Sequence, residues 1–309
     1  EVWASSETDV FAVGPSSVSW ASAVYHYDGT AWSEMAIPGQ LRFLDIWGAS
    51  GNDVYAVGEM GGMIHFDGTE WSAVDLPSVP DDAILTGVFG RSAADIYVVG
   101  YRLVLHFDGS AWSAVEDIPA PPENDWHYEA DWFTAVWVNE SGEVFAASYY
   151  GDVVRFDGAS WEWIRVPVDP CARYYDARIG GSGGELFMTA GDPGVVHYDG
   201  DSWEQMMGYV HRLNDVWGSS ERDVFVVGDG GAILHFDGSE WSQMSSGTCN
   251  SLYGVWGTSP NDVYAVGSEV VAQTQQARAV PTRIASGCQR SARLASLISF
   301  TSTFLPAVT

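Results

Sequence analysis

A histidine, an aspartate and a tryptophan stand within seven residues in the segment ILHFDGSEW, which runs from Ile233 to Trp241. An imidazole and a carboxylate so close in sequence could contribute to a metal site or form a catalytic dyad. The segment is repeated, however, as VYHYDGTAW, MIHFDGTEW, VLHFDGSAW, VVRFDGASW and VVHYDGDSW, which end at residues 32, 71, 112, 161 and 203. Because the segment occurs six times, it could instead be a repeated structural element rather than a chemical site.

A second motif runs in step with the first. Its clearest copies are DIWGASGNDVYAVG (45–58), GVFGRSAADIYVVG (87–100), DVWGSSERDVFVVG (215–228) and GVWGTSPNDVYAVG (254–267). Weaker versions begin at Val2, Val136 and Arg178. The tryptophans that end the repeats are 38 to 49 residues apart. A period of about 40 residues is typical of propellers and solenoids.

Strand signals within one repeat decide between these two architectures. LNDVWG, DVFVVG, ILHF and SEW each have the length and composition of a short β-strand. Asp-Gly predicts a two-residue hairpin turn before the last of them. Four short antiparallel strands per period make one propeller blade. We therefore predict an all-β protein, a β-propeller of four-stranded antiparallel blades, with six complete blades and a partial seventh.

The predicted propeller covers residues 1–268, with a partial last repeat at 252–268. HFDGSEWSQM and HFDGTEWSAVDLP resemble the end of a kelch repeat. Their turn is similar to the Asp-box of BNR-type propellers, although D-G-x-x-W is one residue shorter than the usual D-x-G-x-x-W. The whole repeat, VWGSS…DVFVVGDGGAILHFDGSEW, resembles propellers of bacterial secreted or envelope proteins. This resemblance implies a propeller fold and an extracellular or cell-envelope location.

The repetition favours a structural role for the first motif. Neighbouring sheets lie about 10 Å apart, whereas the ligands of one metal ion lie within about 2 Å of it. Equivalent histidines on successive blades therefore cannot share an ion. We expect each histidine to make an inter-blade or turn hydrogen bond, each aspartate to hold its turn and each tryptophan to pack between blades. The histidines are His26, His65, His106, His197 and His235, and Arg155 takes the sixth position.

An acidic residue precedes the second strand of every repeat. These residues are Asp9, Asp53, Asp95, Glu143, Glu185, Asp223 and Asp262. We expect each to accept backbone N–H bonds in the preceding loop. Ca²⁺ is the alternative, because carboxylates and loop carbonyls are its preferred ligands. One or two acids per loop are few for such a site, so we predict no metal and no cofactor.

Composition limits the partners. The net charge is -28, and all 13 basic residues are arginines. Such a chain repels nucleic acid, which requires clustered basic residues. No apolar run reaches the ~18 residues of a membrane span, so we predict no membrane insertion. Three cysteines, Cys171, Cys249 and Cys288, allow either one bridge with one thiol left over or three free thiols.

Three connections are longer than the equivalent connections in the other repeats, and all three would lie at the same end of the blades. They are residues 15–23, 113–132 and 162–178. Function in repeat folds usually resides in such loops. The candidate ligand-binding residues are Trp20, Trp126, His127, Tyr128, Asp131, Trp163, Arg165, Arg173, Tyr174 and Tyr175. The alternative is that these loops pack on themselves and their aromatic rings cover the ends of the blades.

Rings beside carboxylates and arginines suit a glycan or a protein ligand. We therefore expect a non-catalytic binding or scaffolding propeller and assign no catalytic residue. The alternative is a glycan-active hydrolase or lyase on a sialidase-like scaffold, using the connections 113–132 and 162–178. Against it, the candidate arginines Arg165, Arg173 and Arg178 all come from one connection rather than from separate blades.

The repeat stops after Gly267. Residues 269–309 contain no Trp, no Asp-Gly and a single acidic residue, Glu269. We interpret this segment as a divergent tail, either disordered or the product of a frameshift, and the alternative is a divergent last blade. The sequence predicts that the last blade lacks its third and fourth strands and that ring closure is marginal.

Overall fold

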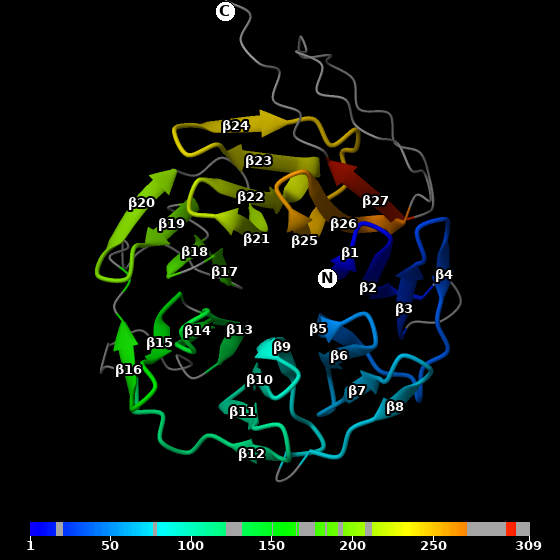
Figure 1. The fold of residues 1–309 in the computed structure, drawn as a ribbon, viewed down its shortest axis with the longest axis vertical. Coiled ribbons are helices and arrows are strands. Elements are labelled where there is room, and N and C mark those ends of the chain that lie inside the picture. Colours follow the sequence, from blue (N-terminus) through cyan, green and yellow to red (C-terminus); the bar gives the residue numbers. More distant parts are fainter. Residues whose placement is uncertain are drawn as a thin grey trace, which may run out of the picture.

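The chain folds as a seven-bladed ring in the computed structural model (Figure 1). The described residues are 1–16, 21–76, 79–121, 132–149, 151–164, 166, 177–182, 184–190, 194–207, 212–270 and 295–300. Their strands form six four-stranded sheets and one three-stranded sheet, each antiparallel and in chain order from the axis to the rim. We call the strands of each blade a to d. The predicted fold, with six complete blades and a partial seventh, is confirmed.

Each of the first four blades consists of four strands that are consecutive in the chain. Blade 1 contains β1 (Val2–Ser6), β2 (Asp9–Pro15), β3 (Ser22–Tyr27) and β4 (Trp32–Glu34). Blade 2 contains β5 (Phe43–Ser50), β6 (Asp53–Gly58), β7 (Met63–Phe66) and β8 (Trp71–Ala73). Blade 3 contains β9 (Leu85–Ser92), β10 (Asp95–Gly100), β11 (Leu103–Phe107) and β12 (Trp112–Ala114). Blade 4 contains β13 (Phe133–Val138), β14 (Val144–Ser148), β15 (Val153–Phe156) and β16 (Trp161–Ile164).

The remaining three blades complete the ring. Blade 5 contains β17 (Arg178–Ser182), β18 (Glu185–Ala190), β19 (Gly194–Tyr198) and β20 (Trp203–Met207). Blade 6 contains β21 (Leu213–Ser220), β22 (Asp223–Gly228), a short 3₁₀ turn η1 (Asp229–Gly231), β23 (Ala232–Phe236) and β24 (Trp241–Met244). Blade 7 contains β25 (Leu252–Ser259), β26 (Asp262–Val270) and β27 (Ala295–Phe300).

Burial decreases from strand b to strand d. In β6, β10 and β22 the five residues after the initial acid are all buried, because a neighbouring blade packs on each face of the sheet. A strand buried on both faces has a continuous apolar run, such as VYAV, rather than an alternating one. The outermost strands β8 and β12 expose their second and third residues.

The Asp-Gly turn is longer than predicted. Phe66 pairs with Trp71, so four residues form the turn and strand d begins at the tryptophan. Asp67 Oδ1 accepts the backbone N–H of Thr69 at 2.8 Å and that of Glu70 at 3.0 Å, and Gly68 has φ +89°. The prediction of a two-residue turn is wrong, because the carboxylate supplies an acceptor inside the turn and closes a four-residue loop. The turn role of the aspartate is confirmed.

The tryptophan that begins each strand d packs against an aromatic ring across this turn. The six pairs have ring centroids 5.1 to 5.5 Å apart. Two of these tryptophans also contact a neighbouring blade. Trp112 lies edge-on to Tyr55 of blade 2 at 6.2 Å, and the indole N–H of Trp71 donates to Met35 Sδ at 3.3 Å. The predicted packing between blades is confirmed at these two positions.

The ring closes between blades 7 and 1 through their inner strands. The indole N–H of Trp256 donates to the carbonyl of Ala4 at 3.2 Å, and the Tyr264 hydroxyl donates to the carbonyl of Glu7 at 2.9 Å. Tyr264 is buried in a cluster with Val2 and Val10. This half of the seam therefore depends on the regular part of the last repeat, which ends at Gly267.

Blade 7 has a third strand that the sequence pattern does not predict. β27 pairs with β26 in antiparallel register, with Ile298 opposite Ala265. The expectation that strand c is missing is wrong, because a segment far beyond the last motif supplies it. Apart from Glu269, Val270 and 295–300, the segment 269–309 lies outside the described residues. The boundary at 268 and the frameshift stay predictions.

Two further features concern the chain as a whole. Cys249, between blades 6 and 7, is disulfide-bonded, and the other two cysteines lie outside the described residues. This favours the first of the two cysteine alternatives. In the part of the chain that the structure describes, no helix has the length and apolar character needed to cross a membrane.

Candidate functional site

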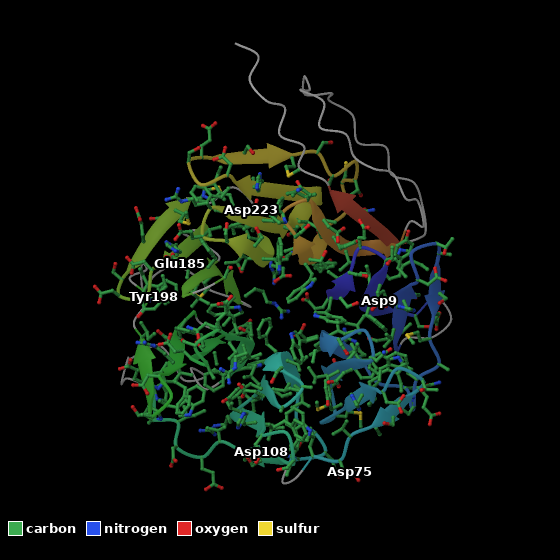
Figure 2. All side chains as sticks on the ribbon, in the orientation of Figure 1. Asp9, Asp75, Asp108, Glu185, Tyr198 and Asp223 are labelled. Atoms are coloured by element: carbon green, nitrogen blue, oxygen red, sulfur yellow. The ribbon has the colours of Figure 1, made fainter. Side chains whose placement is uncertain are left out.

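The repeated histidines bind the acids that begin strand b of their own blades. The Nε2–carboxylate distances are 2.7 Å for His26–Asp9, 2.6 Å for His65–Asp53, 2.8 Å for His106–Asp95 and 2.6 Å for His235–Asp223, and His197 makes the same bond to Glu185. Figure 2 shows Asp9, Glu185 and Asp223 in three different blades. Arg155 replaces the histidine in blade 4 and pairs with Glu143. The predicted hydrogen bond exists, but it lies within a blade.

The acids that begin strand b were expected to accept backbone N–H bonds. In the structure their hydrogen-bond partners are side chains. In blade 6 the carboxylate of Asp223 accepts His235 on one oxygen and the Ser219 hydroxyl on the other. A serine nucleophile needs the histidine itself as its base, whereas this hydroxyl donates to the carboxylate. His235 also stacks on Phe225, with ring centroids 4.3 Å apart. The group is a structural clamp.

The turn aspartates are exposed and remain ionised. Backbone N–H donors two and three residues further on lower the pKa of each of them. At Asp108 and Asp237 a serine hydroxyl is the largest cause, and it lowers the pKa to about 2. Their carboxylates are engaged in their own turns. Among the described residues, no three His, Cys, Asp or Glu side chains gather closely enough to hold a metal ion.

The central axis carries a second group of charged residues. Asp45 Oδ2 accepts the N–H of Val88 in the next blade at 2.8 Å, and Asp215 Oδ2 accepts that of Val255 at 2.7 Å. Each carboxylate therefore joins two neighbouring blades. Burial, followed by the charge of Glu1, raises the pKa of Asp45 to about 7 and that of Asp215 well above its ordinary value.

The cavity between these carboxylates is small. Its volume is about 90 Å³, and the first strands of all seven blades line it. Arg178 lies there with its guanidinium 3.4 Å from the Glu1 carboxylate. Pockets that bind small ligands have volumes of about 300 Å³ or more. The axial group is therefore suited to joining blades rather than to holding a ligand.

Only one of the sequence-predicted ligand residues can be placed. Trp163 lies in β16, stacks on Phe133 at 6.0 Å and donates its indole N–H to the carbonyl of Pro119 at 2.9 Å. These contacts anchor the connection after β12 and agree with the self-packing alternative. The other nine lie outside the described residues: Trp20, Trp126, His127, Tyr128, Asp131, Arg165, Arg173, Tyr174 and Tyr175. Their assignment stays a prediction.

Turns and connections of blades 2 to 4 are joined to one another at the end of the blades where the b–c turns and d–a connections lie. Backbone contacts join them. Gly61 N–H donates to Ala83 at 2.7 Å and Tyr101 N–H donates to Ile84 at 3.3 Å. Tyr101 forms a β-bridge with Trp132, whose carbonyl accepts the N–H of Tyr149 at 2.7 Å. We call this surface, Met60–Gly61, Pro80–Ile84, Tyr101–Arg102, Trp132 and Tyr149, the aromatic strip.

The aromatic strip exposes apolar side chains. Met60 is 67% exposed and Tyr101 is 48% exposed, and Tyr253 in blade 7 is the remaining large hydrophobic residue of the described chain with comparable exposure. Trp132 stacks on Tyr149 at 5.1 Å and meets Tyr101 edge-on at 5.8 Å. Rings held in this way present a fixed apolar surface, and fixed aromatic rings dominate the energy of protein interfaces.

Backbone strain coincides with this exposure. Met60 (φ 59°) and Arg102 (φ 55°) are the two non-glycine residues of the described chain that have positive φ. In the equivalent turn of blade 6, Gly230 stands at the position of Met60 and has φ 69°. A side chain in this conformation costs about 1–2 kcal/mol relative to glycine. Strained residues cluster at functional sites; here Met60 is itself exposed and apolar, and Arg102 directly follows the exposed Tyr101.

Sequence reasoning did not single out Met60, Tyr101 or Trp132. A signal for Met60 exists in the repeat itself, since VGEMGG in blade 2 aligns with VGDGGA in blade 6. Met60 replaces the glycine that the repeat has in blade 6 at this positive-φ position, and the turn keeps its ordinary length. Loop length alone does not reveal it.

Comparison with known proteins identifies the fold. No protein-family model and no curated protein matches the chain. Among solved structures, "YCF48 bound to D1 peptide" is similar with a TM-score of 0.64 and 17% identity, covering 86% of this chain and 87% of that one. The Swd1 β-propeller domain from Myceliophteria thermophila has a TM-score of 0.63 and 13% identity, covering 86% and 91%.

A third structure, the extracellular domain of a hybrid two-component system from B. thetaiotaomicron, has a TM-score of 0.61 and 11% identity. The match covers 85% of this chain and 38% of that one. At these identities the similarity establishes the β-propeller and nothing finer. The kelch and Asp-box resemblance therefore stays a resemblance of motifs.

Proposed function

We propose that this chain is a non-catalytic binding propeller that recognises a segment of a partner protein through the aromatic strip. The observation that carries the proposal is the coincidence of exposure and strain. Of the two non-glycine residues of the described chain that have positive φ, Met60 is itself a strongly exposed apolar residue, and Arg102 directly follows the exposed Tyr101. Folding alone would favour glycine and polar residues there, so a retained cost indicates a use.

The composition of the strip supports a protein ligand over a glycan. Methionine adapts its thioether to irregular apolar partners and is common on binding surfaces that accept peptides. Tyr101, Trp132 and Tyr149 add a rigid ring surface next to it. One structural neighbour is described as bound to a peptide, which is consistent with this use of the fold. The sequence left a glycan and a protein ligand open, and the glycan has no such support.

We also propose that the protein works outside the cytosol. Disulfides persist in oxidising compartments and are rare in the reducing cytosol, and Cys249 is disulfide-bonded. Fractionation of the native host, followed by thiol labelling of Cys249 in each fraction, tests this proposal. A reduced thiol in a cytosolic fraction would contradict it.

Panning a displayed random peptide library against the full-length chain tests the proposed function. Peptides that bind the native chain should lose binding to the Tyr101→Ala variant. Tyr253→Ala is the matched control, because Tyr253 has the same 48% exposure in a different blade. Equal binding by both variants would refute the strip as the site. A glycan array probed with the same three proteins decides between the two ligand classes, and glycan binding that depends on Tyr101 would overturn the protein ligand.

A further inference from the structure

The aromatic strip has a charged edge beside Met60. A tight turn, in which Ala83 N–H donates to the carbonyl of Pro80 at 3.0 Å, places Asp81 and Asp82 at its tip, and both are exposed. The bond from Gly61 to Ala83 at 2.7 Å fixes this turn against the b–c turn of blade 2. The turn that carries the two carboxylates is therefore held against the turn that carries the exposed Met60.

These carboxylates lack internal partners in the described part of the chain. No salt bridge or side-chain hydrogen bond engages Asp81 or Asp82 there, whereas the neighbouring Glu59 pairs with Arg42 at 2.9 Å. The turn aspartates at the other end of the blades differ, because each accepts bonds from its own turn. The negative charge beside Met60 is thus available to another molecule.

The strip therefore has its described, unpaired charge at one end, in the turn that carries Asp81 and Asp82. Complementary charges fix the register and orientation of a partner more than they raise its affinity. The net charge of -28 attracts cationic segments over longer distances.

We infer that the segment bound by the aromatic strip is cationic at one end, with an arginine or lysine facing Asp81 and Asp82 and an adjacent apolar or aromatic residue lying on Met60 and Tyr101. This inference rests on the proposed function, because it assigns a chemical class to the ligand of the same surface.

Three sets of synthetic dodecapeptides test the inference, each with a fixed Leu-Trp pair preceded by Arg, Gln or Glu and with randomised flanks of neutral residues. Binding to the full chain is measured by fluorescence anisotropy at low and high salt. We expect the Arg set to bind at least about tenfold more tightly than the Glu set at low salt, with the difference reduced at high salt. Equal affinities for the three sets would overturn the inference.

A double variant, Asp81→Asn with Asp82→Asn, locates the effect. It should remove most of the preference for Arg while leaving the binding of the Gln set unchanged. The control is Asp201→Asn with Glu204→Gln, two exposed acids of blade 5 near the rim, which should keep the preference. An unchanged preference in the first variant would also overturn the inference, and thermal denaturation verifies that both variants fold.

The Tyr101→Ala variant separates this inference from the proposed function. Binding that requires Tyr101 but is indifferent to charge leaves the proposed function intact and refutes the cationic ligand. Charge-dependent binding that is indifferent to Tyr101 refutes the aromatic strip as the site, and the inference fails with it.

Discussion

The two ends of blade 2 obey different rules. At one end His65 binds Asp53 and Asp67 closes its turn, as the equivalent residues do in most other blades. At the other end Met60 has φ 59° in a turn where blade 6 has Gly230 at φ 69°. The backbone has the same conformation in both blades, but only one of them carries an exposed side chain there. Contacts that recur in most blades indicate a structural role. A residue that replaces glycine at a strained backbone position indicates a functional one.

The largest expected effect is on stability, at the end of the blades where the histidine–acid pairs lie. Asp223→Ala leaves the buried His235 without its acceptor and removes the partner of Ser219. A buried polar group that loses its partner costs about 1–3 kcal/mol, so we expect a decrease of about 2 kcal/mol in the free energy of unfolding. Urea denaturation measures it. Peptide affinity should not change.

The control for this substitution is Asp201→Ala. Asp201 is exposed, so this substitution should change the free energy of unfolding of the protein by less than about 0.5 kcal/mol. A similar loss in both variants would mean that the histidine–acid clamps contribute no more than a surface charge does.

The next effect belongs to the other end. Tyr101→Ala removes the most accessible ring of the aromatic strip and should weaken peptide binding by about 30-fold, which corresponds to about 2 kcal/mol for a central interface residue. Its effect on unfolding should be within about 0.5 kcal/mol, because the side chain is 48% exposed. Titration calorimetry and urea denaturation of the same variant measure the two quantities. A large loss of stability would place Tyr101 with the architectural residues.

A reciprocal exchange tests the comparison most directly. Met60→Gly should raise the free energy of unfolding by about 1 kcal/mol through relief of the positive φ, and it should weaken binding. Gly230→Met should lower the free energy of unfolding by a similar amount without altering binding. Chemical denaturation and anisotropy measure both. If Met60→Gly destabilised the fold, the strain assigned to Met60 would be absent.

A further effect concerns pH. The pKa of Asp45 is raised to about 7, so between about pH 4 and pH 7 the folded state holds more protons than the unfolded state. Its contribution to stability is therefore present at low pH and is lost as the pH rises through about 7. One group changes the free energy of unfolding by at most about 1.4 kcal/mol per pH unit, and we expect less.

Asp45→Asn isolates this term, because an amide oxygen can still accept the N–H of Val88 but cannot ionise. The variant should show a smaller fall in stability between pH 4 and pH 7 than the native chain. The turn aspartates have the opposite sign, since their lowered pKa values give stability that is lost only in stronger acid. Identical pH profiles for the native chain and the variant would refute the role of Asp45.

Much of the fold was predictable because it repeats. Residues such as Asp237 and Trp241 recur at intervals of 38 to 49 residues, and period and strand length together indicate a four-stranded blade. The partners of individual side chains were less predictable. His235 was expected to bond between blades or in its turn, but register pairs it with Phe225, and its ring bonds Asp223 of the same blade.

The candidate site was harder to predict than the fold. Loop length drew attention to the long connections, and of the residues chosen there only Trp163 could be placed. Met60 and Tyr101 lie in turns of ordinary length, so length does not distinguish them. The aromatic strip is formed by backbone bonds between segments up to 31 residues apart, such as the bridge between Tyr101 and Trp132 and the bond between Tyr149 and Trp132. Local composition does not encode such contacts.

The sequence alone determined the blade, its strands, its turn residues and the number of repeats. These properties depend on local backbone preferences and on the alternation of buried and exposed positions, both of which act within about 40 residues. Only the tertiary structure decided how the ring closes through Trp256 and Tyr264, how β27 completes a third strand, and which exposed residues lie side by side. Those outcomes depend on packing between segments distant in sequence, where many pairings share the same local pattern and only one closes the ring.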